Sequence, residues 1–383
     1  MRILHTSDWH VGRTFHGHQT LDHLEAVLIA LATLVAAKRV DVVVIAGDVF
    51  DSAIPNGAAM ALLGRVLQQI IAGGAQVVLT AGNHDSATRL GYLANFTAAS
   101  GLHIFTDPNR IGHPIPIADP GGGEVLFFGV PFLDPVMIRH LAPQVRSQSD
   151  AMQWAMGQIS AATPPGARSV VTAHTFVVSN GIDADVAAEA KSAPRDFTRG
   201  GVDNVSATVF TGPTYVALGH LHGRSKIANQ IRYSGAPLCY SFGEIGRKRG
   251  VWIVDIDVGG NVVADWADLP IPRPLRQLTG ELRKLLEAQE YQDAETCWVK
   301  AILTDNTRPV DAMRLLQQRF PYCAEIEYRP AQTLNLGIGS YTERIKSLSD
   351  AQITADFLAH VRNGEGPTAA EIELIAELMG SGS

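Results

Sequence analysis

MRILHTSDWH, residues 1–10, begins with an apolar run that passes directly into a polar loop. Residues 2–6 predict a short buried strand, and Asp8 and His10 follow at its carboxyl end. Two later stretches repeat the arrangement: DVVVIAGDVFD (41–51) and QVVLTAGNHD (76–85) also run from Val, Ile and Leu into a loop of Gly, Asp, Asn and His. Continuous apolar runs of this kind are typical of strands that are buried on both faces of a sheet.

Helical stretches separate these strands, at residues 21–39 and 57–72. The resulting βαβαβ order continues with predicted strands at 125–130, 169–172, 215–218 and 250–257. This alternation predicts an α/β core in which a sheet is sandwiched by helices.

The composition limits the possible function classes. The chain has 383 residues, 46% of them apolar, and a net charge of −7 with an isoelectric point near 6.0. This charge counts against a large basic surface for nucleic acid, although a metal centre or a partner subunit can supply the positive charge. The longest apolar run, 26–37, is too short to span a bilayer. We therefore expect no membrane partner. Three dispersed cysteines without a CxxC pair favour a reducing, cytoplasmic setting.

Three prolines within residues 270–274 mark a linker. Beyond it, a helix at 280–288, a strand at 298–304, a helix at 310–320 and a strand at 324–328 predict a small α+β domain. We therefore expect domains at 1–270 and 271–335 and a helical segment at 336–383. In the last segment, Ser349 with Gln352 and Thr368 with Glu371 have the spacing of helix-starting capping boxes.

The polar residues that carry chemistry follow predicted strand ends in five blocks. A single block has an ordinary interpretation: a loop Asp next to a His is usually a solvated turn, Gly-Asp is often a helix cap, and a lone His is often a hydrogen-bonded core residue. Five such blocks at strand ends favour a metal site instead. The candidate ligands are Asp8, His10, Asp48, Asn83, His174, His220 and His222.

Seven such side chains suit hydrolysis of a phosphate ester. Two divalent ions about 3.5–4 Å apart activate a water and offset charge on the phosphoryl oxygens. Mixed imidazole and carboxylate ligands favour manganese, iron, zinc or nickel over calcium. If one carboxylate bridges the ions, each ion receives four contacts, and Asp48 is the natural bridge.

The ordered motifs resemble the signature of the calcineurin-like metallophosphoesterases. Residues 4–12, 46–51, 173–176 and 233–237 are similar, more narrowly, to the nuclease subunits of bacterial SbcCD-type complexes. The resemblance is strong over about 1–268 and concerns only the layout thereafter. It implies a β-sandwich flanked by helices, with a small α+β capping domain for DNA and a C-terminal helical segment that docks on a partner ATPase.

The resemblance also implies roles for individual residues. One ion would be held by Asp8, His10, Asp48 and His222, and the other by Asp48, Asn83, His174 and His220. His84 would be the catalytic histidine that meets the phosphate, with Asp85 orienting its ring. Asp51 is left outside the ligand set.

The implied activity is metal-dependent cleavage of DNA in repair, recombination and replication, with manganese as the expected metal. It would combine double-strand exonuclease with single-strand and hairpin endonuclease activity. The implied partners are DNA, the SbcC ATPase and a second copy of the chain, together a heterotetramer. Arg13, Arg247 and Lys248 are candidate phosphate contacts, although the basic run 247–249 is equally typical of a solvated turn.

Two alternatives remain open from the sequence. The same ligands would serve another calcineurin-like phosphodiesterase or a phosphatase that acts on small or protein substrates, but the segment beyond 271 favours the nuclease. A scaffold that has lost its chemistry is the second alternative. Metal analysis and a nuclease assay distinguish the nuclease from these two alternatives.

Overall fold

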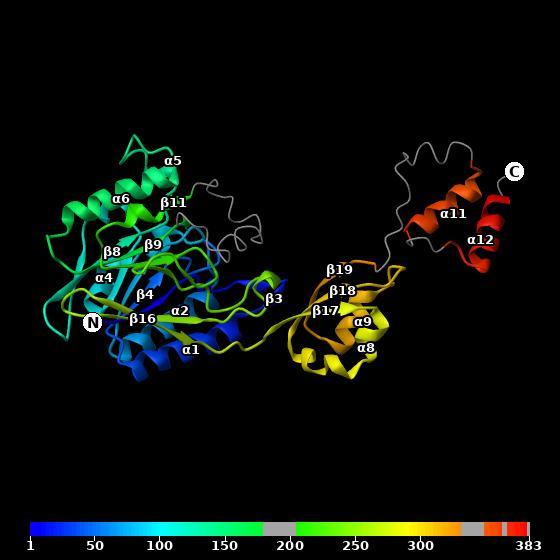
Figure 1. Ribbon diagram of the computed structural model, residues 1–383, viewed down its shortest axis with the longest axis horizontal. Helices are drawn as coiled ribbons and strands as arrows, with labels where there is room; N and C mark the ends of the chain where they lie inside the picture. Colours follow the sequence, from blue (N-terminus) through cyan, green and yellow to red (C-terminus); the bar gives the residue numbers. More distant parts are fainter. Residues whose placement is uncertain (179–203, 331–347, 362–365, 381–383) are drawn as a thin grey trace. The chain divides into compact units, whose positions relative to one another are not determined.

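The computed structural model describes residues 1–178, 204–330, 348–361 and 366–380 (Figure 1). The chain divides into two compact units, Met1–Pro272 and Arg273–Ser383. The division falls inside the predicted proline linker, whereas the predicted boundary at 335/336 lies outside the described residues.

The first sheet of the amino-terminal unit has six strands in the order β16-β15-β1-β4-β5-β6. Its four parallel strands carry the apolar runs of the sequence, and two antiparallel strands from much later in the chain extend it beside β1. The bounds are β1 Arg2–Thr6, β4 Val42–Ala46, β5 Gln76–Thr80, β6 Leu102–Phe105, β15 Gly250–Ile256 and β16 Val262–Asp268.

The second sheet also has six strands, in the order β13-β14-β12-β9-β8-β7. Its four central strands are parallel and its two edge strands are antiparallel. The bounds are β7 Ile115–Ala118, β8 Glu124–Val130, β9 Ser169–His174, β12 Tyr215–Gly219, β13 Ser225–Lys226 and β14 Ile231–Tyr233.

The two sheets pack face to face, and helices cover both outer faces. Apolar side chains of both sheets, such as Val44, Phe127 and Ala217, form a buried core between them. Helices α1 (Leu21–Lys38) and α2 (Gly57–Ala72) pack on the first sheet, and α6 (Gln148–Ala162) packs on the second. Figure 1 shows α6 on one side of the strands and α1 with α2 on the other. The β-sandwich flanked by helices that the family resemblance implies is confirmed. The βαβαβ order of the sequence, taken alone, predicts a single sheet between helices.

Close approach of the two sheets brings their carboxyl ends together. A Cβ on Gly219, at the end of β12, would lie 1.7 Å from the carbonyl oxygen of Ala46 at the end of β4. A Cβ on Gly47 would lie 2.2 Å from the ring of His174. Glycine at these positions therefore allows the loops after β4 and β12 to meet.

The remaining strands and α-helices in the described part of the first unit are short. They are β2 Thr14–Phe15, β3 His18–Gln19, α3 Ala87–Leu90, α4 Ala94–Thr97, α5 Pro135–Ile138, β10 Val177–Val178 and β11 Val205–Ser206. Among the described residues, no helix is both long and apolar enough to cross a membrane.

The second unit contains a three-stranded parallel sheet, β17-β18-β19, with helices α8 and α9. Its core includes Leu278, Leu285 and Phe320. The sequence did not predict β17, because its six residues follow the prolines directly and mix polar with apolar side chains. The bounds are β17 Leu275–Gly280, α8 Leu282–Glu287, β18 Trp298–Leu303, α9 Ala312–Arg319 and β19 Cys323–Tyr328.

Two further helices, α11 (Asp350–Val361) and α12 (Ala369–Gly380), follow the sheet. Both predicted capping boxes are present: the amide of Ser349 donates to the Gln352 side chain at 2.9 Å, and that of Thr368 donates to Glu371 at 2.8 Å. In return, the hydroxyls of Ser349 and Thr368 accept the amides of Gln352 and Glu371. The side chains of the capping boxes therefore satisfy main-chain amides at the start of each helix.

Candidate metal centre

The five predicted blocks meet where the two sheets approach each other. Asp8 and His10 follow β1, Asp48 follows β4, and Asn83 with His84 follows β5. His174 ends β9 in the other sheet, and His220 and His222 follow β12. The structure thus brings all seven candidate ligands to one edge of the sandwich.

A first group of donors consists of Asp8, His10 and His222, whose candidate ligand atoms all lie within 4.8 Å of one another. The Nε2 atoms of His10 and His222 are only 3.1 Å apart. Two imidazole nitrogens at this separation suit a shared cation, because their lone pairs can converge on one ion.

Asp48 lies between this group and a second one. Its Oδ2 atom is 3.6 Å from His10 Nε2 and 3.4 Å from His174 Nε2. Its other oxygen accepts the main-chain amide of His84 at 2.9 Å. One carboxylate oxygen therefore faces histidines of both groups, as a bridging ligand would.

The second group is built around Asn83. Its side-chain oxygen lies 3.1 Å from His174 Nε2 and 3.1 Å from His220 Nδ1. Together with Asp48, these residues offer two imidazoles, an amide oxygen and a carboxylate oxygen. Such a mixed donor set suits a first-row transition ion.

The protonation states fit a cation-binding site. Burial lowers the pKa of His10 and of His220 to about 3, so that both rings are neutral and present a lone pair. Burial also lowers the pKa of His174, but the neighbouring Asp48 carboxylate outweighs it and raises this pKa to about 9. Burial raises the pKa of Asp8 to about 6. The centre thus attracts positive charge next to Asp48.

The main chain is strained at the same residues. Asp8, His10 and Asp48 adopt left-handed conformations with φ of 53°, 44° and 46°. Such conformations are uncommon for residues with a side chain and cluster at functional sites. A Cβ on Gly82 would lie 2.0 Å from the Asp48 carboxylate, which explains the glycine before Asn83.

His84 lies beside the first group, with its ring 4.8 Å from that of His10 and perpendicular to it. Its Nδ1 is 2.9 Å from the main-chain oxygen of Asp51. Donation to that oxygen places the proton on Nδ1 and leaves Nε2 available for a substrate or an ion.

The expectation that Asp85 orients the His84 ring is wrong. The Asp85 carboxylate instead accepts three main-chain amides, those of Val49, Phe50 and Gly82, at 2.9–3.0 Å. These amides belong to the loops after β4 and β5 and would otherwise be buried without partners. Asp85 therefore holds the two loops together, and the main chain at Asp51 orients His84.

Asp51 belongs to the surroundings of the first group. Its carboxylate lies 3.3 Å from His10 Nδ1 and 3.3 Å from the Arg13 guanidinium. The Arg13 side chain is 15% exposed and lies over the ring of Tyr240. Arg13, one of the three predicted phosphate contacts, is therefore joined to the centre through Asp51.

The basic run at 247–249 is divided between surface and interior. Lys248 pairs with Asp268 at 2.9 Å, and the amide of Arg247 donates to the Glu244 carbonyl. Arg249 is only 3% exposed and forms a buried ion pair with Glu244. Within this run, Arg249 is the residue whose guanidinium is directed inward, toward Glu244.

Sequence reasoning missed several residues that hold the ligands. The Ser7 hydroxyl donates to Asp8 at 2.5 Å and is 2.9 Å from the hydroxyl of Ser234. The hydroxyl of Tyr240 donates to the Trp9 carbonyl at 2.7 Å. Ser234 stands in the Tyr-Ser-Gly-Ala-Pro motif at 233–237, which was the available signal, but only folding places it beside Ser7.

The fold and the centre define a phosphoesterase, and the chain belongs to the calcineurin-like phosphoesterase family, whose model matches residues 1–224. Residues 271–362 match a second model, described as the type 5 capsule protein repressor C-terminal domain. The chain is similar to the SbcCD nuclease subunit, SbcD, of Staphylococcus epidermidis, with 27% identity over 328 residues, covering 84% of this chain and 83% of the relative.

Two solved structures are also similar. One is a dimetal phosphatase from Danio rerio, with a TM-score of 0.41 and 13% identity, covering 69% of this chain and 98% of the other. The second is GAP50, the anchor in the inner membrane complex of Plasmodium, with a TM-score of 0.41 and 11% identity, covering 86% and 98%.

Proposed function

We propose that this chain is a metal-dependent DNA nuclease that acts as the nuclease subunit of an SbcCD-type complex. The observation that carries the metal chemistry is the position of Asp48 Oδ2, within 3.6 Å of histidines from both ligand groups. The similarity to the SbcCD nuclease subunit, together with the second matched domain, supports DNA as the substrate.

The residues present would hold two divalent ions, one with Asp8, His10, Asp48 and His222 and one with Asp48, Asn83, His174 and His220. Such ions supply positive charge for the phosphoryl oxygens and a water that is acidic near neutral pH. His84 presents Nε2 beside the first group, where it can contact a phosphate oxygen or give a proton to the leaving oxygen. The Arg13 guanidinium adds a further positive charge near the same group.

The proposed activities are exonuclease on double-stranded ends and endonuclease on single strands and hairpins, with manganese as the metal. The small domain beyond 271 is proposed to cap the DNA, with Arg247 and Lys248 as further candidate phosphate contacts. A cytoplasmic location is part of the proposal and is supported by the three free cysteines, Cys239, Cys297 and Cys323.

Helices α11 and α12 are the proposed docking site for the SbcC ATPase. Several of their apolar side chains are about half exposed or more, including Phe357 at 50% and Leu378 at 68%. Helices of twelve residues are marginal without a packed apolar face. A coiled coil of the partner would cover these side chains.

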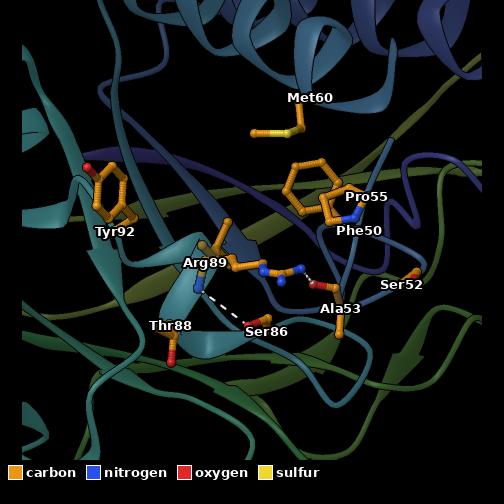
Figure 2. A pocket seen from close by; sticks show the side chains of 10 residues that line it. Phe50, Ser52, Ala53, Pro55, Met60, Ser86, Thr88, Arg89 and Tyr92 are labelled. Atoms are coloured by element: carbon orange, nitrogen blue, oxygen red, sulfur yellow. Dashed lines mark hydrogen bonds between the residues drawn. The ribbon is translucent and has the colours of Figure 1, made fainter. Parts of the chain in front are cut away.

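A second copy of the chain is the proposed occupant of an apolar surface on the first unit. A pocket of about 430 Å³ lies on this surface. Figure 2 shows its lining, which comes from the loop at 50–55, from Met60 of α2, and from Arg89 and Tyr92. Met60 is 59% exposed and Tyr92 is 80% exposed, and Phe96 nearby in the chain is 79% exposed. Exposed apolar patches are uncommon on monomers, which supports association of two copies here.

The test begins with protein freed of metal by chelation. We expect manganese to restore cleavage of linear, hairpin and single-stranded DNA more fully than magnesium, because imidazole-rich sites favour softer first-row ions. The reactions are run with and without the SbcC partner and ATP. A generic phosphodiester such as bis(p-nitrophenyl) phosphate serves as the control substrate.

Three results would contradict the proposal. Full activity in magnesium refutes the manganese assignment. Hydrolysis of the generic diester without any DNA cleavage, alone or with the partner, favours a small-substrate phosphodiesterase. Failure to bind metal at all favours a scaffold without chemistry.

A further inference from the structure

A buried ion pair, Glu244 with Arg249, lies directly behind His222. Glu244 is 6% exposed and Arg249 is 3% exposed, and the two side chains are 2.5 Å apart. Removing two charges from water is costly, so such a pair is weak evidence for stability by itself. Its contacts with His222 indicate what else the pair does.

The first contact is with the ring of His222. Glu244 Oε1 lies 3.7 Å from His222 Nδ1, while Glu244 Oε2 accepts the Tyr240 amide at 3.0 Å and the Arg249 guanidinium. On the other side of the ring, Nε2 of His222 is 3.1 Å from Nε2 of His10. A ring that offers its Nε2 lone pair to a cation must carry its proton on Nδ1, which is the nitrogen that faces Glu244.

The second contact is with the main chain of the same residue. Arg249 Nη1 donates to the His222 carbonyl at 2.5 Å and to the Ala236 carbonyl at 3.4 Å. The Ala236 amide donates to the same His222 carbonyl at 3.0 Å. A Cβ on Gly235 would lie 2.4 Å from that oxygen, and Gly235 has a φ of +77°. The pair therefore holds His222 at its ring and at its carbonyl.

His174 and His10 obtain their outer contacts differently. His174 Nδ1 is 2.9 Å from the main-chain oxygen of Ala46, which no substitution of a side chain removes. His10 Nδ1 faces Asp51, which is 31% exposed and also contacts Arg13. Glu244 is instead a buried carboxylate that contacts His222 from outside the ligand set. Its effect on the ion site can therefore be measured separately.

We propose that Glu244 is a positioning residue, which, with Arg249 behind it, fixes the tautomer and orientation of His222 and so sets the affinity of the ion site formed by Asp8, His10 and His222. A carboxylate behind a ligand histidine raises the basicity of the ring and restricts its rotation. This inference rests on the proposed metal centre.

The experiment measures manganese binding by calorimetry on the metal-free full chain of wild type and Glu244→Ala. Loss of an outer partner of this kind lowers metal affinity by about 10- to 100-fold. We expect this loss for one ion, with little change in the affinity of the other. The paramagnetic resonance spectrum of bound manganese should lose the signal of a paired centre at concentrations that fill both wild-type sites.

The variant Glu244→Gln distinguishes the effect of the Glu244 charge from the effect of its side-chain size. The amide keeps the size of the side chain and an acceptor for the Tyr240 amide, but it removes the charge that faces His222. We expect the affinity loss to persist in this variant while its metal-free melting temperature returns toward that of wild type. A purely structural role predicts instead that Gln restores the metal affinity together with the melting temperature. If Glu244→Ala does not fold, the Gln variant alone decides.

Asp119→Asn is the matched control, because Asp119 and Arg168 form a second buried pair in the same unit. We expect it to lower the melting temperature without changing the affinity for either ion, which shows that destabilisation alone does not weaken the site. Unchanged affinities in both Glu244 variants would overturn the inference while leaving the metal centre intact. Absence of binding in wild type would instead overturn the proposed function.

Discussion

His84 differs from the candidate ligands in how its ring is held. Its Nδ1 is committed to the Asp51 carbonyl at 2.9 Å, and its ring is perpendicular to that of His10. Substitution of His84 by Ala should therefore leave both ions in place while it removes the group that meets the substrate. We expect turnover to fall by about 10²- to 10⁴-fold.

The measurement combines the metal content of purified His84→Ala with its rate on DNA in manganese. His140→Ala is a matched control, because that exposed ring lies against the Met137 carbonyl of its own segment. The control should keep wild-type turnover. Loss of an ion in His84→Ala would show that His84 is itself a ligand.

Asp48 is the residue whose substitution should weaken the binding of both ions. Its Oδ2 faces His10 and His174, so an amide in its place removes the negative charge shared by the two groups. Asp48→Asn should weaken both ions at once. Asp8→Asn should weaken mainly the ion held with His10 and His222.

Titration of metal-free protein with manganese distinguishes these two variants. Two weakened binding steps are expected for Asp48→Asn and one for Asp8→Asn. Near wild-type stoichiometry and affinity in Asp48→Asn would refute the bridging role.

Among the elements, an ion pair joins the ends of β7 and β9. The Asp119 carboxylate, 1% exposed, follows β7 and pairs with Arg168 immediately before β9. Burial alone would raise the pKa of Asp119, but the Gly121 amide and the Arg168 guanidinium outweigh it and lower this pKa to about 2. A lowered pKa stabilises the fold above the unfolded value and loses that contribution as the pH falls toward the folded value.

Asp119 should thus contribute about 2 kcal/mol to the free energy of unfolding at pH 5, and this part should disappear as the pH falls from about 4 to about 2. The check is denaturant unfolding of wild type and Asp119→Asn across this range. The difference in the free energy of unfolding between wild type and Asp119→Asn should fall by about 2 kcal/mol as the pH is lowered to about 2. A gap that stays constant with pH would contradict the lowered pKa.

The elements themselves were largely predictable. The observed bounds of β1, α2 and β5 are those expected from residues 2–6, 57–72 and 76–80, because continuous apolar runs mark buried strands and a helical period marks an amphipathic helix. The sequence did not predict β17, where six mixed residues follow a run of prolines. It also did not reveal that the strands form two sheets, since pairing partners are far apart in the chain.

In the candidate site too, features that depend on neighbouring residues could be predicted, whereas contacts between residues far apart in the chain could not. The ligand blocks could be proposed because each follows a strand end, which is a local pattern. The contacts of Asp85 and Glu244 could not be proposed in this way. An acid next to a histidine in the sequence suggests a pair with that ring, whereas main-chain amides bind Asp85. The carboxylate behind His222 comes from 22 residues later in the chain.

For the molecule as a whole, the net charge of −7 and the exposed apolar side chains of α11 and α12 both support the proposed dependence on a partner. An acidic chain offers few phosphate contacts of its own, so a partner that binds DNA would raise the local concentration of substrate. The exposed apolar side chains of α11 and α12 are the proposed attachment point. Their removal should separate partner binding from catalysis.

We expect deletion of residues 349–383 to abolish binding to the SbcC coiled coil while manganese-dependent cleavage by the isolated chain is retained, because the candidate centre lies wholly within Met1–Pro272. Leu378→Asp, which places a charge on the 68% exposed leucine, should weaken binding by itself, since burying an unpaired charge is costly. Glu373→Gln on the same helix is the matched control and should bind normally. Unchanged binding after the deletion would refute docking through α11 and α12. Loss of cleavage with a lowered melting temperature would instead show that these helices stabilise the chain by packing on its own domains.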